Sequence, residues 1–328
     1  MSGRYLVTGG AGFVGSHLVL ALLRAGASVT VLDDLTTGHE AAVPEGARLL
    51  RGSVADAGTV ERAFADGPYE AVFHFASLTL VGESMREPVR YMAENFAGAA
   101  TLVQACVTHG VNRVVISSTA NLFAEPERMP IDEDEAVIPG SPYGESKAML
   151  ERLLYWADRI HGVRGACLRY FNAAGADPEG EAGEDHRPET HLIPIVLDAA
   201  AGRRDPLTVF GDDYPTPDGT CIRDYIHVAD LAAAHLAVLE PLRSRSVRYN
   251  LGTGKGHSVR EVIAASEQVT GLKVPYTIGK RREGDPAVLV AASRRITDEL
   301  GWRPRYADLA TIVGHAWAWR QAHPKGYG

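Results

Sequence analysis

The length, composition and charge of the chain limit what it can be. Its 328 residues suffice for one large or two ordinary domains, and 45% hydrophobic with 23% charged residues is an ordinary globular mixture. The formal net charge of −8 argues against a general nucleic-acid-binding or acidic-membrane surface. Three widely spaced cysteines, Cys106, Cys167 and Cys221, suggest a reducing compartment and no metal cluster. The N-terminal residues contain no unbroken apolar run, so we expect no signal peptide, no membrane span and a cytoplasmic location.

A glycine cluster follows the first apolar run. Residues 5–8 have the character of a short strand, then come Gly9, Gly12 and Gly15, and apolar residues return with helical spacing from Val14. Glycine lets the backbone turn tightly and approach a pyrophosphate, which would bind at the N-terminus of the following helix. Any tight strand-to-helix turn can use such glycines, so the prediction of a dinucleotide-binding loop also depends on the flanking strand and amphipathic helix.

An acidic pair ends the second strand-like run. Residues 29–32 lead into Asp33, eighteen residues after Gly15, and Asp34 follows. This position suits a carboxylate that binds a ribose. Because a carboxylate accepts hydrogen bonds from free ribose hydroxyls and repels an added phosphate, the pattern favours NAD over NADP.

Strand-like and helical segments alternate through the first half of the chain. This alternation predicts an α/β fold, a Rossmann-type doubly wound parallel sheet with helices on both faces and ligands at the carboxyl ends of the strands. The later strand-like runs are 47–50, 71–75, 114–117 and 166–170, and the crossover helices are expected over 60–64, 89–109 and 142–161.

The regular alternation stops after Tyr170, where residues 175–189 form a loop rich in glycine and acidic residues. We therefore predict an NAD-binding Rossmann domain over residues 1–171, to which segments near 220–255 return. A smaller α/β substrate-binding domain is expected mainly over residues 172–328.

Tyr143 and Lys147 lie four residues apart at the start of a predicted helix, so their side chains share one face. A tyrosine with a pKa near ~10 is a poor base at neutral pH, but an adjacent ammonium and a positively charged nicotinamide would both favour the phenolate. The same spacing also occurs between unrelated surface residues. Here it follows a dinucleotide loop and the strand end at 117–119, so we predict a catalytic general base.

At this point the chain resembles the extended short-chain dehydrogenase/reductase superfamily, and within it the UDP-glucose (UDP-galactose) 4-epimerases. The resemblance runs from about Arg4 to Tyr327. Motifs at residues 8–17, 73–76 and 141–147 are common to the superfamily, and those at 168–172, 223–228 and 282–285 are more specific to the nucleotide-sugar branch.

The resemblance implies an NAD-dependent isomerase acting on C4 of a UDP-hexose. Tyr143 would take the proton of the sugar 4-hydroxyl while the C4 hydride passes to NAD, and the 4-keto sugar would turn and take the hydride back on its other face. Thr119 would hydrogen-bond the reacting oxygen, and Lys147 would hold the nicotinamide ribose. The implied cofactor-binding residues are Gly9, Gly12, Phe13, Val14, Gly15, Asp33, Asp34, Ser53, Val54, Phe75, Ala76, Ser77, Asn95, Ser117, Tyr143, Lys147 and Tyr170.

The resemblance also implies how a UDP-sugar is held. Arg223 and Arg282 would bind the diphosphate, Asp285 a ribose hydroxyl, and Phe210 would flank the uracil. The full implied set is Thr119, Tyr143, Asn172, His191, Leu192, Phe210, Arg223, Tyr225, Arg282, Asp285 and Leu289. A homodimer through the helices at 89–109 and 142–161 is expected, with no metal site and no nucleic-acid or membrane partner.

Several positions depart from the common epimerase pattern and leave alternatives open. Ser53 replaces an aspartate that contacts adenine, Thr79 replaces a lysine, and Leu289 is intermediate between residues that exclude and admit N-acetyl groups. Residues 120–123 lack the carboxylate of related dehydratases, which argues against elimination of water. The alternatives are a 4-epimerase of UDP-N-acetylglucosamine, UDP-glucuronate or a UDP-pentose, a net NAD-dependent oxidoreductase, or an NAD-binding protein without catalysis.

Overall fold

The computed structural model describes residues 3–282 and 285–328, so Glu283 and Gly284 of the motif at 282–285 lie outside the described residues. The chain divides into two compact units, and each is described by itself. The first unit comprises Met1–Ala124, Ala136–Arg169 and Ala232–Tyr249, and the second comprises Glu125–Glu135, Tyr170–Leu231 and Asn250–Gly328.

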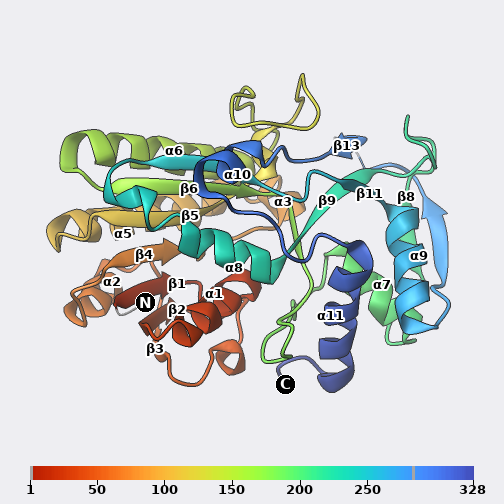
Figure 1. The fold of residues 1–328 in the computed structure, drawn as a ribbon, viewed down its shortest axis with the longest axis horizontal. Coiled ribbons are helices and arrows are strands. Elements are labelled where there is room, and N and C mark those ends of the chain that lie inside the picture. Colours follow the sequence, from red (N-terminus) through yellow and green to blue (C-terminus); the bar gives the residue numbers. More distant parts are fainter. Residues whose placement is uncertain (1–2, 283–284) are drawn as a thin grey trace. The chain divides into compact units, whose positions relative to one another are not determined.

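A seven-stranded sheet forms the centre of the first unit. Its strand order is β10-β6-β5-β4-β1-β2-β3, in which Figure 1 labels the six strands from β6 to β3, and the pairs β3–β2, β2–β1, β1–β4 and β4–β5 run parallel. The order reverses direction between β1 and β4, which opens a crevice at their carboxyl ends. This confirms the predicted doubly wound α/β fold. The strands are β1 (Arg4–Thr8), β2 (Ser28–Asp33), β3 (Arg48–Arg51), β4 (Ala71–His74), β5 (Arg113–Thr119), β6 (Arg164–Tyr170) and β10 (Val247–Leu251).

The helices that connect these strands follow the predicted pattern with one difference. The helix expected over 89–109 contains a π-helical segment, η2, where the side chain of Asn95 turns inward and bonds both the N–H and the carbonyl of Leu78. An extra residue in the turn re-aims a side chain at the expense of regular hydrogen bonding. The helices are α1 (Phe13–Arg24), η1 (Glu40–Ala42), α2 (Ala57–Ala65), α3 (Val81–Ser84), α4 (Pro88–Tyr91), η2 (Met92–Ala97), α5 (Gly98–Thr108), η3 (Ala120–Leu122), α6 (Pro142–His161), α8 (Val228–Ala237, spanning the unit boundary) and η4 (Pro241–Arg243).

Helix α6 has clear start and stop signals. The Ser141 hydroxyl oxygen accepts a hydrogen bond from the N–H of Gly144, and Pro142 occupies the first helical position. Gly162 ends the helix in a left-handed conformation with φ of 70°. These local signals place Tyr143 and Lys147 on the first two turns.

A buried ion pair supports the end of β5. Arg169 is fully buried on β6, and its guanidinium donates to both carboxylate oxygens of Glu151 on α6, at 2.8 and 2.5 Å. The Ser118 hydroxyl donates to the same carboxylate at 2.7 Å. Removing one partner of such a pair leaves an uncompensated buried charge, so the three side chains hold β5, β6 and α6 together.

The second unit combines small sheets with a helical layer. One sheet has the order β11-β9-β13 with β7 beside β9, and a separate pair joins β12 to β8. Apolar side chains of α7, α9, α11 and β8 form its core. Its elements are β7 (Asn172–Ala174), α7 (Leu192–Ala200), β8 (Leu207–Phe210), β9 (Ile222–His227), β11 (Gly256–Ser258), α9 (Val259–Thr270), β12 (Tyr276–Gly279), β13 (Val288–Leu289), α10 (Arg294–Leu300) and α11 (Leu309–Ala322). Among the described residues, no helix combines the length with the apolar character needed to cross a membrane.

Candidate active site

The loop between β1 and α1 is packed so closely that it requires glycine. A Cβ on Gly9, which has φ of 72°, would lie 2.4 Å from the backbone nitrogen of Ala76. A Cβ on Gly15 would lie 2.1 Å from the carbonyl oxygen of Gly9. At Gly12, the N-cap of α1, the nearest atom to a Cβ would be 3.4 Å away. Gly9 and Gly15 therefore serve packing, whereas Gly12 leaves the N-terminus of α1 uncovered for an anion.

The end of β2 places Asp33 directly beside this loop. Asp33 is buried, and its carboxylate accepts hydrogen bonds from the N–H groups of Ala11 and Leu35, both at 2.9 Å. Burial raises the pKa of Asp33, although the two backbone hydrogen bonds oppose that shift. Asp34 is exposed and caps the N–H of Thr36. The structure thus brings Asp33 to the glycine loop and leaves Asp34 at the rim.

Tyr143 and Lys147 are both buried on the inner face of α6. The Lys147 ammonium donates to the Ser77 hydroxyl at 2.9 Å and to the Ser117 carbonyl at 3.0 Å, and lies 5.9 Å from the centre of the Tyr143 ring. Burial lowers the pKa of Lys147 to about 8, so the ammonium is mainly charged at neutral pH. Burial raises the pKa of Tyr143, and its hydrogen bond with Thr119 acts in the opposite direction.

Asn121 of η3 positions the hydroxyl of Thr119, which ends β5. Its oxygen accepts hydrogen bonds from the backbone N–H and the side-chain amide of Asn121, both at 3.1 Å. With both acceptor positions used, the hydroxyl has its single proton left to donate. Thr119 can therefore donate a hydrogen bond at the Tyr143 phenol or at an oxygen beside it.

The remaining cofactor candidates of the first unit mostly surround the same crevice. Phe75, Ala76 and Ser77 follow β4, Ser117 lies near the end of β5 and accepts from Lys147, and Asn95 holds the backbone of Leu78. Phe13 and Val14 begin α1. Ser53 accepts a hydrogen bond from the N–H of Ala55, and Val54 is buried in the core. Tyr170 ends β6 and belongs to the second unit.

Some of the substrate candidates of the second unit lie on or beside β9, and the others stand on separate elements. Arg223 forms an ion pair with Asp285 and lies beside Leu289 of β13 in the strand register. Asn172 of β7 pairs with the buried Tyr225 and donates its amide to the Asp224 carbonyl at 3.0 Å. The Arg282 guanidinium lies 4.1 Å from the centre of the Phe210 ring. His191 and Leu192 stand at the start of α7.

The sequence analysis missed Asp224, which is fully buried between Arg223 and Tyr225. Its carboxylate accepts hydrogen bonds from the N–H groups of Thr253, Gly254 and Ala291 at 2.8, 3.1 and 3.2 Å. These contacts hold β9 against the segments before β11 and after β13. The signal available in the sequence was an acidic residue within a strand-like run, because a buried carboxylate must find donors.

Comparison with known proteins identifies the family. The NAD dependent epimerase/dehydratase family model matches residues 5–252. The chain belongs to this family. It is 49% identical over 324 residues to the UDP-glucose 4-epimerase of Halalkalibacterium halodurans, with 98% of this chain and 97% of the relative covered. It is 46% identical over 324 residues to the UDP-glucose 4-epimerase of Lacticaseibacillus casei, with 98% of each covered.

Solved structures that resemble this chain are also UDP-glucose 4-epimerases. A crystal structure of a UDP-glucose 4-epimerase superposes with a TM-score of 0.97 at 46% identity and covers 99% of both chains. The UDP-glucose 4-epimerase of Brucella ovis in complex with NAD superposes with a TM-score of 0.93 at 43% identity, covering 96% of this chain and 98% of that chain. The predicted resemblance and the prediction of NAD as cofactor are confirmed.

The first unit of this family member fits NAD. Gly9 and Gly15 let the loop pack closely, and Gly12 leaves the N-terminus of α1 without a side chain to cover it. Asp33 supplies a carboxylate at the end of β2, and Lys147 supplies a buried positive charge. Together these groups would supply a phosphate site, a ribose acceptor and a positive charge to a bound dinucleotide.

The buried His74 predicts how the stability of the folded protein changes in acid. Burial lowers its pKa to about 3 from the usual 6.5, and its Nδ1 lies 2.7 Å from the Thr8 hydroxyl. Because the unfolded chain binds the proton first, the stability that His74 contributes is fully present above pH 6.5 and is lost toward pH 3 by roughly 1.4 kcal/mol per pH unit. Urea denaturation between pH 7 and pH 4.5 should show a shallower decline for His74→Gln than for the wild type. His161→Gln, which alters an exposed histidine, is the control, and parallel curves for all three proteins would refute the assignment.

Proposed function

We propose that this protein is a UDP-hexose 4-epimerase that interconverts UDP-galactose and UDP-glucose through a transient 4-keto sugar, with NAD retained throughout. The observation that carries the proposal is the buried group of Tyr143, Lys147 and Thr119 at the carboxyl end of β5. A phenol, an ammonium and a hydroxyl in one buried place are the parts that a reversible oxidation at one carbinol carbon requires.

The roles of the chain's own residues follow from their contacts. Bound NAD supplies reversible hydride acceptance. The Tyr143 phenolate takes the proton from the sugar 4-hydroxyl and later returns it, and the Thr119 hydroxyl donates a hydrogen bond to the reacting oxygen. The Lys147 ammonium stabilises the phenolate, and Ser77 and Ser117 hold that ammonium in place. Since burial raises the pKa of Tyr143, the phenolate depends on positive charge nearby.

The surroundings of Thr119 support epimerisation over elimination of water. The neighbouring polar side chain is the uncharged amide of Asn121, which donates to Thr119. An amide cannot exchange a proton with a sugar carbon or a leaving hydroxyl at neutral pH. Inversion at C4 would need only the hydride exchange with bound NAD and the proton exchanged with Tyr143.

The second unit is proposed to bind the UDP part. Arg223 and Arg282 would contact the diphosphate, because guanidinium groups form strong, directional hydrogen bonds with phosphate. Asp285, which now pairs with Arg223, would accept from a uridine ribose hydroxyl. Phe210 is 38% exposed and offers an aromatic face to the uracil. The phosphate and sugar region is proposed to be lined by Asn172, His191, Leu192, Tyr225 and Leu289. Whether the space beside Leu289 admits N-acetylated sugars is decided by assay.

The test is incubation of purified protein with UDP-galactose, without added NAD, followed by chromatographic resolution of the UDP-sugars. We expect the same UDP-glucose to UDP-galactose ratio from either starting sugar. NADH release in proportion to the substrate consumed, without UDP-glucose, would instead show a net oxidoreductase. Parallel reactions with UDP-N-acetylglucosamine, UDP-glucuronate and a UDP-pentose distinguish the other 4-epimerases.

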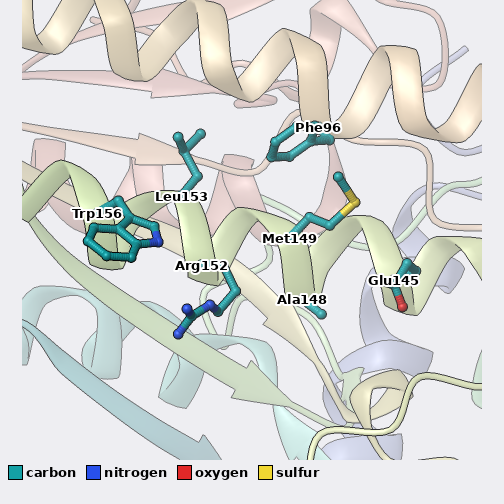
Figure 2. Close-up of a pocket in the computed structure, with 7 residues that line it drawn as sticks. All are labelled: Phe96, Glu145, Ala148, Met149, Arg152, Leu153 and Trp156. Atoms are coloured by element: carbon teal, nitrogen blue, oxygen red, sulfur yellow. The ribbon is translucent and has the colours of Figure 1, made fainter.

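We also propose a homodimer formed through α6 and the helical stretch containing η2 and α5. Figure 2 shows the groove on this face, where Phe96 of η2 lies near Met149 and Leu153 of α6. Its volume is about 360 Å³, and Trp156 and Ile160 remain 52% and 68% exposed on the same helix. The groove is lined by Phe96, Glu145, Ala148, Met149, Arg152, Leu153 and Trp156. An apolar surface rimmed by charged residues is typical of an interface, and a second copy satisfies it symmetrically.

Trp156→Glu should weaken this dimer. A buried tryptophan near the centre of an interface typically contributes at least about 2 kcal/mol, which raises the dissociation constant roughly 30-fold. Light scattering after size exclusion at several concentrations measures the change. Ile278→Glu alters a similarly exposed apolar residue, 43% exposed on β12, and should leave the dimer intact. A monomeric wild type, or equal effects of both substitutions, would contradict the proposed interface.

A cytoplasmic location is proposed from the cysteines. All three, Cys106, Cys167 and Cys221, are free thiols, and the first two are buried. Unpaired buried thiols are usual in a reducing compartment.

A further inference from the structure

Four potential metal ligands meet in the loop that precedes α7 in the second unit. Glu184, His186, Glu189 and His191 each offer one ligand atom, and these atoms all lie within 4.8 Å of one another. The order Glu-x-His-x-x-Glu-x-His brings two carboxylates and two imidazoles from eight consecutive residues to one point.

The spacing of the ligand atoms suits a tetrahedral ion. His186 Nδ1 lies 3.3 Å from Glu184 Oε1 and 3.6 Å from Glu189 Oε2. His191 Nδ1 contacts Glu184 Oε1 and lies 3.8 Å from Glu189 Oε1. Ligands at ordinary zinc bond lengths in a tetrahedron lie about 3.4 Å from one another. Small side-chain rotations would therefore bring the four groups around one ion.

The charge and burial of the group favour a cation at its centre. The side chains of Glu184 and Glu189 are only 5% and 11% exposed, so two carboxylates share a poorly solvated space. His191 is 53% exposed and leaves an open side through which an ion can enter. A divalent ion would neutralise both carboxylates while both imidazoles stay neutral, as metal ligation requires.

The loop is held in place by the C-terminal part of the chain. The N–H of Gly183 donates to the Tyr327 hydroxyl at 3.0 Å, and a Cβ on Gly183 would lie 2.0 Å from the Trp319 ring. The Arg320 guanidinium donates to the Glu184 carbonyl at 3.1 Å. Glu189 is oriented by the N–H groups of Thr190 and His191, which donate to its Oε1 at 2.8 and 2.9 Å. The backbone of the group is thus anchored independently of any ion.

We propose that Glu184, His186, Glu189 and His191 bind one divalent transition-metal ion, with zinc as the best fit. Two nitrogen and two oxygen ligands suit an ion of intermediate softness, and four protein ligands are typical of a structural site. Such an ion fixes His191 and Leu192 at the start of α7. This departs from the sequence-based expectation of no metal site, and it does not depend on the proposed epimerase activity.

Tag-free full-length protein, treated with a chelator and dialysed, tests the proposal by calorimetric titration with Zn²⁺. We expect one Zn²⁺ per chain and a rise in the melting temperature. Co²⁺ added in place of Zn²⁺ should give the strong visible absorption of tetrahedral coordination. Glu184→Gln and His186→Gln should each weaken Zn²⁺ binding by more than about tenfold.

The matched control is His109→Gln, since His109 Nε2 lies 2.8 Å from a Glu61 carboxylate oxygen outside the group. It should retain wild-type Zn²⁺ binding. Absence of stoichiometric Zn²⁺ binding by the wild type would overturn the proposal and leave a proton-bridged ion-pair cluster. Equal affinities for the wild type and the two ligand variants would also overturn it, and the wild-type titration decides the matter even where a variant does not fold.

Discussion

Tyr143→Phe should reduce the turnover of UDP-galactose roughly 10²–10⁴-fold, because general acid–base catalysis by a positioned side chain contributes about that much and the phenol is the proposed proton carrier. The substitution keeps the volume of the buried ring and removes one oxygen. Its hydrogen bond with Thr119 is lost, which costs about 1 kcal/mol of stability. Steady-state kinetics, the bound NAD content and urea denaturation measured on the same preparation separate catalysis from folding.

The control for this experiment is Tyr155→Phe on the same helix. Tyr155 is 42% exposed, and its hydroxyl accepts a hydrogen bond from Arg159 at 3.0 Å. Its loss should leave turnover unchanged. A Tyr143→Phe enzyme that keeps a tenth or more of the wild-type turnover would show that another group moves the proton.

The second large effect is expected from Gly15→Ala. The added methyl would lie 2.1 Å from the carbonyl oxygen of Gly9 and 2.9 Å from the Cα of Gly10, both backbone atoms that cannot move away alone. Overpacking of this kind typically costs about 1–3 kcal/mol, and here the added methyl must displace α1 or the glycine loop. We expect a lower free energy of unfolding and protein that purifies with little NAD.

Gly12→Ala separates packing from cofactor binding in the same loop. A Cβ at Gly12 would come no closer than 3.4 Å to any atom, and the residue has φ of −85°. Its unfolding free energy should change by less than about 1 kcal/mol. The methyl would nevertheless occupy the surface proposed for the pyrophosphate, so the NAD content should fall. Urea denaturation and NAD released on heating measure the two effects, and an equally stable Gly15→Ala protein would contradict the packing argument.

Local signals predicted much of the first unit. The glycine spacing at 9, 12 and 15, the apolar periodicity of α1 and the cap, proline and glycine around α6 act over a few residues, and a neighbouring segment cannot easily override them. The Tyr143 and Lys147 pair could be predicted for the same reason, because helical geometry alone places residues four apart on one face.

Other features depend on residues that are distant in the sequence. Asn95 turns inward from the π-helical η2 to bond Leu78, and Lys147 contacts Ser77, 70 positions away in the chain. The carboxylate of Asp224 finds its donors in segments 29 to 67 residues away. The periodicity of apolar residues in the sequence does not predict such pairings, because they depend on how packed elements bring polar groups together.

The sequence by itself determined the fold class, the family resemblance and the cofactor, since these depend on short-range backbone requirements and motifs. Only the tertiary structure decided which polar groups meet. The inward turn of Asn95, the donors around Asp224 and the convergence of Glu184, His186, Glu189 and His191 follow from the packing of the chain, because a buried polar group takes whichever partner that packing brings within reach.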